Sequence, residues 1–160
     1  MLNFDELTIK IENLAYERFG GSREKNIYVG KAYEKVAGYF LDKICDFKIR
    51  TEKKPDIDLL GYRDNQRYAI QVTEHTKSDE VFPKRNLGDF VNATRALEAK
   101  SEIKINMMLV LFECRPTPEE MELYIYPYGI KIVTESKIRY SSRELDWSEC
   151  LEEIEPIFES

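Results

Sequence analysis

The chain has 160 residues with 30 acidic and 24 basic side chains, and its net charge of -6 excludes a protein that coats nucleic acid through bulk positive charge. A composition of 42% hydrophobic and 34% charged residues is that of a soluble globular protein. No apolar run approaches the roughly 20 residues that a membrane-spanning helix needs, and acids stand where a secretion signal would be apolar.

This length is most simply one domain, covering residues 1–160. The three cysteines, Cys45, Cys114 and Cys150, are odd in number and widely spaced. This spacing indicates buried thiols in a reducing compartment, and not a disulfide framework or a zinc site. We therefore expect a single cytoplasmic domain that has no membrane partner.

The first half of the chain predicts two helices and three strands. Apolar residues recur at helical intervals over residues 3–19 and about 29–45, and the turn-rich GGSREKN separates these segments. Strand character follows at residues 47–50, 57–60 and 67–74. The sequence RDNQ, residues 63–66, supplies the turn between the last two strands.

The second half predicts a helix over residues 87–100 and a central strand over the apolar run 105–114. Two further strands are expected at 123–127 and 130–134. Asp146 and Glu149 form a capping box that begins a last helix. This order of elements predicts an α/β fold, in which helices flank a mixed sheet.

The predicted hairpin PDIDLLGYRDNQRYAIQVTEHTK carries polar residues inside both of its strands. Alternation places Gln71, Thr73 and His75 on one face, and pairing across the turn brings Asp58 close to Gln71 on one surface. Carboxylate and amide oxygens are hard ligands that suit magnesium, which holds phosphates and activates water. The alternative is an ordinary hairpin with one wet face.

The helix GKAYEKVAGYFLDK, the short strand after it, DIDLLG and AIQVT resemble the core of the PD-(D/E)xK nuclease superfamily. The resemblance covers residues of about 29–114. It implies a restriction-endonuclease-like αβββαβ core, to which this chain adds an N-terminal helix and C-terminal strands plus a helix. Residue by residue, it implies that Glu34, Asp58 and Gln71 hold Mg²⁺ or Mn²⁺.

The activity implied by this resemblance is metal-dependent hydrolysis of nucleic-acid phosphodiester bonds, with DNA as the expected partner. Many relatives act as homodimers. The family's strand lysine would stand at position 73, where this chain has Thr73, which carries no charge. His75 on the same face, or a lysine from another element such as Lys31, Lys35 or Lys84, would then replace it.

Two alternatives remain open. In one, the nuclease fold has lost its chemistry and binds nucleic acid or a protein partner. In the other, the domain is an interaction module, with Tyr124, Tyr126 and Tyr128 as its partner surface. These alternating tyrosines fit a half-buried sheet edge better than a platform for unpaired bases.

The sequence also contains residues suited to phosphate contacts within local basic strips. The candidates are Lys35, Lys53, Lys54, Lys84 and Arg85. Lys53 and Lys54 belong to the strip KIRTEKKP, which would lie close to the site of a nuclease core.

Overall fold

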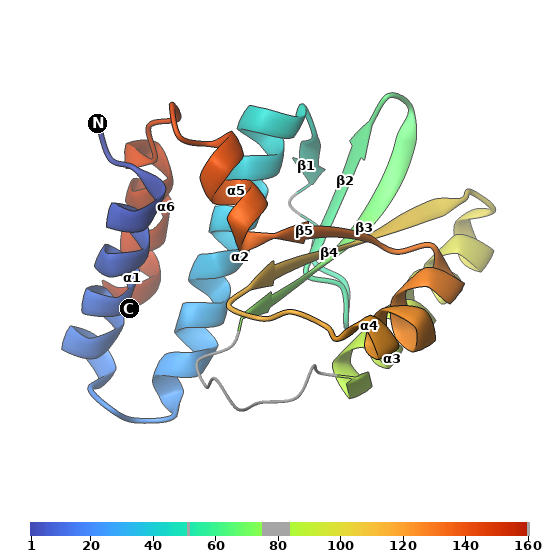
Figure 1. Ribbon diagram of the computed structural model, residues 1–160, viewed down its shortest axis with the longest axis horizontal. Helices are drawn as coiled ribbons and strands as arrows, with labels where there is room; N and C mark the ends of the chain where they lie inside the picture. The colour runs from blue at the N-terminus through green and yellow to red at the C-terminus, as the bar shows by residue number, and fades with distance from the viewer. Residues whose placement is uncertain (51, 75–83, 160) are drawn as a thin grey trace.

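The computed structural model describes residues 1–50, 52–74 and 84–159, and within them helices cover both faces of an open sheet of five strands (Figure 1). The α/β class predicted from the sequence is confirmed. In chain order the elements are α1 (Phe4–Phe19), α2 (Glu24–Cys45), β1 (Lys48–Arg50), β2 (Leu59–Arg63), β3 (Gln66–Glu74), α3 (Lys84–Ser101), β4 (Ile105–Phe112), α4 (Pro118–Glu120), η1 (Met121–Ile125), η2 (Tyr126–Tyr128), β5 (Lys131–Thr134), α5 (Glu135–Ser141) and α6 (Ser148–Glu159).

The sheet has the order β1-β2-β3-β4-β5 and is mixed. Strands β1, β2 and β3 pair antiparallel, whereas β3, β4 and β5 pair parallel. The carboxyl ends of β3, β4 and β5 therefore lie at one end of the sheet. Because β2 runs against β3, β2 begins at that same end of the sheet, where the candidate site lies.

The turn between β2 and β3 forms as the sequence predicts. Asp64 and Asn65 have φ of 52° and 64°, and Arg63 pairs with Gln66 across them. Two positive φ values in a two-residue loop define a turn whose twist matches the strands, and Asn and Asp tolerate this conformation. The turn fixes the register of the hairpin.

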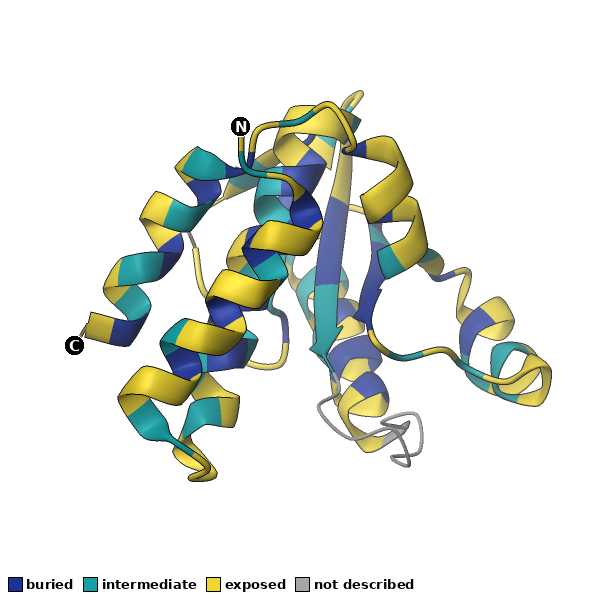
Figure 2. Ribbon diagram, turned by 60° about the vertical axis from the view of Figure 1, so that its left-hand side comes forward, coloured by how far each residue is buried: buried dark blue, intermediate teal, exposed yellow. Residues whose placement is uncertain are grey.

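Two hydrophobic cores hold the sheet between its helices. The α2-side core packs α1, α2 and α6 against one face, with Phe40 and Trp147 fully buried. The α3-side core packs α3 and η1 against the other face, around Phe90 and Ile125. Strand β4 is buried on both faces, as its continuous apolar run predicts. Figure 2 shows buried residues on the sheet strands and on the sides of the helices that pack against them.

The strand predicted at residues 123–127 is wrong. This segment forms a π-helical turn, η1, followed by a 3-10 turn, η2. A capping box between Thr117 and Glu120, with Pro118 at the first helical position, begins a helix just before it. Because helical turns occupy this segment, its tyrosines form no strand stripe, and β5 pairs with β4 instead.

Several boundaries also differ from the prediction. Helix α2 begins at Glu24, inside the segment expected to be a turn, and the short helix α5 was not predicted. Asp146 does not form the expected capping box with Glu149. Its carboxylate instead accepts the backbone N–H groups of Ser148 and Leu2, at 3.1 and 3.0 Å, and so ties α6 to the N-terminus.

In the described ranges, no helix is both long and apolar enough to cross a membrane. The three cysteines are free thiols.

A pair of glycine substitutions tests the β1–β2 register. A Cβ at Gly61 would lie 3.0 Å from the Lys48 carbonyl oxygen and 3.1 Å from Cδ1 of Ile49. We expect Gly61→Ala to lower the free energy of unfolding by about 1–3 kcal/mol, because backbone must move. The matched change Gly88→Ala, in α3 with open space around it, should raise stability by about 0.5–1 kcal/mol.

Urea unfolding of both variants measures these two free energies. A Gly61→Ala protein as stable as the unchanged chain would contradict the close pairing of β1 with β2.

Candidate functional site

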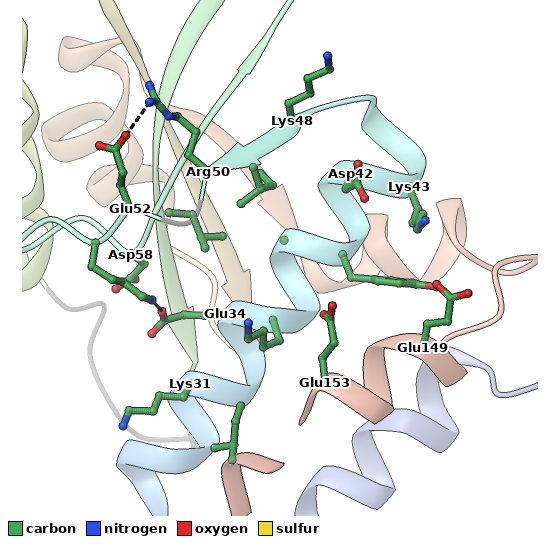
Figure 3. A pocket seen from close by; sticks show the side chains of 17 residues that line it. Lys31, Glu34, Asp42, Lys43, Lys48, Arg50, Glu52, Asp58, Glu149 and Glu153 are labelled. Atoms are coloured by element: carbon green, nitrogen blue, oxygen red, sulfur yellow. Dashed lines mark hydrogen bonds and ion pairs between the residues drawn. The ribbon is translucent and has the colours of Figure 1, made fainter. Parts of the chain in front are cut away.

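A groove of about 720 Å³ runs over the α2 face of the sheet, bordered by β1 and α6 (Figure 3). Helix α2 forms its floor. At one end Glu34 from α2 and Asp58 from the segment before β2 line the groove together with Lys53. This end of the groove lies at the end of the sheet where β2 begins.

Asp58 is held in place by the backbone of the neighbouring strand. Its Oδ2 accepts the backbone N–H of Val72 in β3 at 2.8 Å. Strand β2 begins only at Leu59, which pairs with Ile70, so the carboxylate takes the place of a backbone acceptor beyond the strand's end. The side chain is thus both a strand terminator and the innermost acid of the groove.

A bend at Asp58 breaks the alternation of side chains. Ile57 and Leu60 both belong to the α3-side core, whereas Leu59 packs on the α2 side. A regular strand would have placed Asp58 on the same face as Leu60 and Gln71, and the surface predicted for Asp58 and Gln71 assumes that regular strand. The prediction is wrong, because the bend leaves Asp58 and Leu59 together in the groove.

Gln71 lies on the other face of the sheet. It pairs in register with Leu109, whose side chain belongs to the α3-side core, and Thr73 pairs in the same way with Leu111. The predicted shared surface for Asp58 and Gln71 therefore does not form. The Gln71 side-chain oxygen is buried and accepts no hydrogen bond from the residues that the structure describes.

Glu34 and Asp58 form an electrostatic pair. Burial raises the pKa of Asp58 to about 6, and the nearby Glu34 carboxylate adds to this rise. The Val72 N–H and the Lys53 ammonium act in the opposite direction. Lys53 Nζ lies 3.2 Å from Glu34 Oε1, so one lysine partly balances both acids. The structure thus brings together three of the predicted site residues.

The other predicted residues are dispersed. Lys35 lines the same groove, on α2. Lys54 is exposed and lines a smaller pocket of about 110 Å³. Arg85 is exposed in the first turn of α3, where Lys84 is the first residue. His75 lies outside the described residues.

The predicted tyrosine surface does not form as one stripe. Tyr124 packs against the α3-side core, whereas Tyr126 is largely exposed. The guanidinium of Arg95, on α3, lies 5.1 Å from the ring centroid of Tyr128.

Sequence reasoning missed the far wall of the groove. Glu149 and Glu153 of α6 line it, together with Ile157. Their spacing of four residues beside the buried Cys150 and Ile154 is a readable helical pattern, but only the packing of α6 on α2 shows what this row faces. Lys48 and Arg50, alternating on β1, form the opposite wall.

The groove supplies two carboxylates at its inner end. Within the part of the chain that the structure describes, no group of three or more His, Cys, Asp or Glu side chains is arranged to hold a metal ion. Comparisons of the chain with protein-family models, curated proteins and solved structures found no match.

The buried charge of Asp58 predicts a pH-dependent stability difference. The pKa of Asp58 in the folded protein, about 6, lies above the ordinary 3.8, so folding disfavours the ionised form. Asp58→Asn keeps an acceptor for the Val72 N–H and removes the charge. It should therefore raise the free energy of unfolding by about 1–2 kcal/mol at pH 7–8.

This gain should shrink as the pH falls through 6 and vanish below about 4, where Asp58 is protonated in both states. Urea unfolding of both proteins between these pH values measures it. A gain that is independent of pH would contradict the buried ionised carboxylate.

Proposed function

We propose that this protein is a metal-dependent nuclease-like domain that hydrolyses phosphodiester bonds of nucleic acid, with DNA as the expected substrate. The observation that carries the proposal is the half-buried Asp58 close to Glu34 and Lys53 in a charged groove. Strongly perturbed carboxylates in a cleft are typical of functional sites.

The order of elements supports the proposal. From α2 to β4 the chain follows helix, three strands, helix and strand, which is the αβββαβ order of the nuclease superfamily that the sequence resembles. Glu34 lies on the first of these helices and Asp58 directly before the second strand. These are the two positions at which the resemblance expects acids.

The residues at the inner end of the groove suit a divalent cation. Glu34 and Asp58 offer the hard oxygen ligands that Mg²⁺ and Mn²⁺ prefer. Burial raises the pKa of Asp58 despite the opposing charge of Lys53, and a bound cation would favour the ionised carboxylate further. When bound, such an ion provides a water of lowered pKa and a charge that holds phosphate oxygens. Gln71 is not part of this ligand set, because it faces α3.

Lys53 is our candidate for the missing strand lysine. Thr73 carries no charge and faces α3. Lys53 contacts Glu34 and favours the ionised form of Asp58. Its ammonium can therefore pair with a phosphate oxygen that lies between the two acids.

A second candidate function keeps the fold without the chemistry. The ion pair between Lys53 and Glu34 already satisfies one of the two acids without a metal, and Thr73 stands at the lysine position. The groove would then bind nucleic acid or a protein partner without cutting it. For either function we propose the cytoplasm as the compartment, because free thiols fit a reducing environment.

Cleavage assays with matched aspartate variants test the nuclease proposal. The substrates are labelled single-stranded, double-stranded and branched DNA and RNA, each with Mg²⁺ or Mn²⁺. We expect metal-dependent cutting that Asp58→Asn reduces by about 10²–10³-fold, since it removes a charged ligand. Asp56→Asn, the same change at an exposed position two residues away, should leave the rate unaltered.

Full activity in Asp58→Asn would refute the metal site. Salt-dependent binding by the unchanged protein without any cutting would instead support the second candidate function.

The role of Lys53 predicts a shift in the pH–rate profile. Lys53→Gln removes a positive charge that lowers the pKa of Asp58, so the acidic limb of kcat/KM should move to higher pH as the rate falls. Lys54→Gln changes an exposed neighbour outside the groove, and it should alter neither the acidic limb nor the rate. A pH–rate profile that Lys53→Gln leaves unchanged would show that Lys53 lines the groove without influencing the ionisation of Asp58.

A further inference from the structure

The groove has two walls of opposite charge (Figure 3). Lys48, Arg50 and Lys53 make the wall at β1 and the segment after it mainly basic. Glu52 of the same wall pairs with Arg50 at 2.6 Å, and Lys53 pairs with Glu34 of α2 at 3.2 Å. Glu149 and Glu153 form an acidic wall on α6. Among the described residues no ion pair joins one wall to the other, so the two charges face each other across open space.

The acidic wall is a direct result of how α6 packs. The helix buries Cys150, Ile154 and Phe158 in the α2-side core. Glu149, Glu153 and Ile157 are spaced by four residues and form an adjacent row, which lines the groove. Both glutamates are exposed and, within the described chain, have no ion-pair partner. Their negative charge is therefore available to whatever enters.

The floor between the walls contains an apolar patch beside the charged α2 residues Lys35, Asp42 and Lys43. Gly38 of α2 leaves room above Leu59, and Ile49 and Tyr39 line the same space. The Tyr39 hydroxyl donates to the Asp146 carbonyl at 3.0 Å, which anchors the side chain at the α6 end. A ligand in this groove thus meets a mainly basic wall on one side, a floor with an apolar patch among charged α2 residues, and the α6 carboxylates on the other side.

We propose that the groove selects single-stranded nucleic acid, with the phosphates along the basic wall and the bases over the floor. The inference rests on the proposed function and adds its substrate class. Base amino groups can donate to the Glu149 and Glu153 carboxylates, as they do in recognised base contacts. Apolar and aromatic surface beside a basic track is the usual arrangement for binding single strands.

A duplex is disfavoured by the same geometry. Its second backbone would bring phosphates towards Glu149 and Glu153, and like charges repel strongly near a protein surface. The volume of about 720 Å³ is also that of a small-ligand pocket, so it accommodates a short piece of one strand. The acidic wall therefore determines specificity.

Binding measurements with matched glutamate variants test this inference. The probes are a fluorescent DNA single strand of about 16 nucleotides and the same strand in a blunt duplex, in EDTA so that no cleavage occurs. We expect the unchanged protein to bind the single strand about tenfold more tightly. The Glu149→Gln, Glu153→Gln double variant should bind the duplex about fivefold more tightly than before, with single-strand affinity changed less than about twofold.

The control is the Glu152→Gln, Glu159→Gln double variant, which has the same charge change on exposed α6 residues outside the groove lining. It should alter neither affinity. Equal binding of both probes by the unchanged protein, or a duplex affinity that the groove variant does not raise, would overturn the inference while leaving the proposed function intact. Failure of the unchanged protein to bind either probe would also overturn the inference, whereas the cleavage assay with Mg²⁺ or Mn²⁺ decides the proposed function separately.

Discussion

The hydrogen bond from the Val72 backbone N–H to the Asp58 carboxylate is the contact on which the groove depends. It ends the β2–β3 pairing, because a side chain replaces the next backbone acceptor. The chain can then bend at Asp58, so that this acid turns towards the α2 face. Without the bend, regular alternation would direct the carboxylate to the α3-side core, away from Glu34.

Placing the Asp58 carboxylate in the groove lowers the stability of the fold. A half-buried acid beside another acid is less favourable than the same acid in water, and a single lysine, Lys53, offsets only part of the difference. Chains seldom retain such a group in a structural position, since an apolar or amide side chain would serve better. This imbalance is one reason why we propose a chemical role for the pair formed by Glu34 and Asp58.

Regular periodicity made much of the fold predictable, whereas irregular backbone did not. The apolar stripes of α1 and α3, the buried run of β4 and the turn at Asp64 and Asn65 follow from sequence spacing alone. The face of the sheet on which Asp58 lies could not be predicted. Alternation with period two assumes a regular strand, whereas the bend at Asp58 is fixed by a hydrogen bond to another strand. The strand predicted for the tyrosine-rich segment after residue 121 was wrong for a related reason, since tyrosines at alternate positions also occur in helical turns. The acidic wall could not be predicted either, because it depends on the packing of α6 on α2, which no local sequence pattern encodes.

The two outer strands of the sheet have a further consequence, for self-association. Strands β1 and β5 are the edges, and they are only three and four residues long. Short edges that carry charged side chains, here Lys48 and Arg50, are poor templates for strand addition from another molecule. The basic side chains that border the groove thus also disfavour edge-to-edge pairing of the sheet with another molecule.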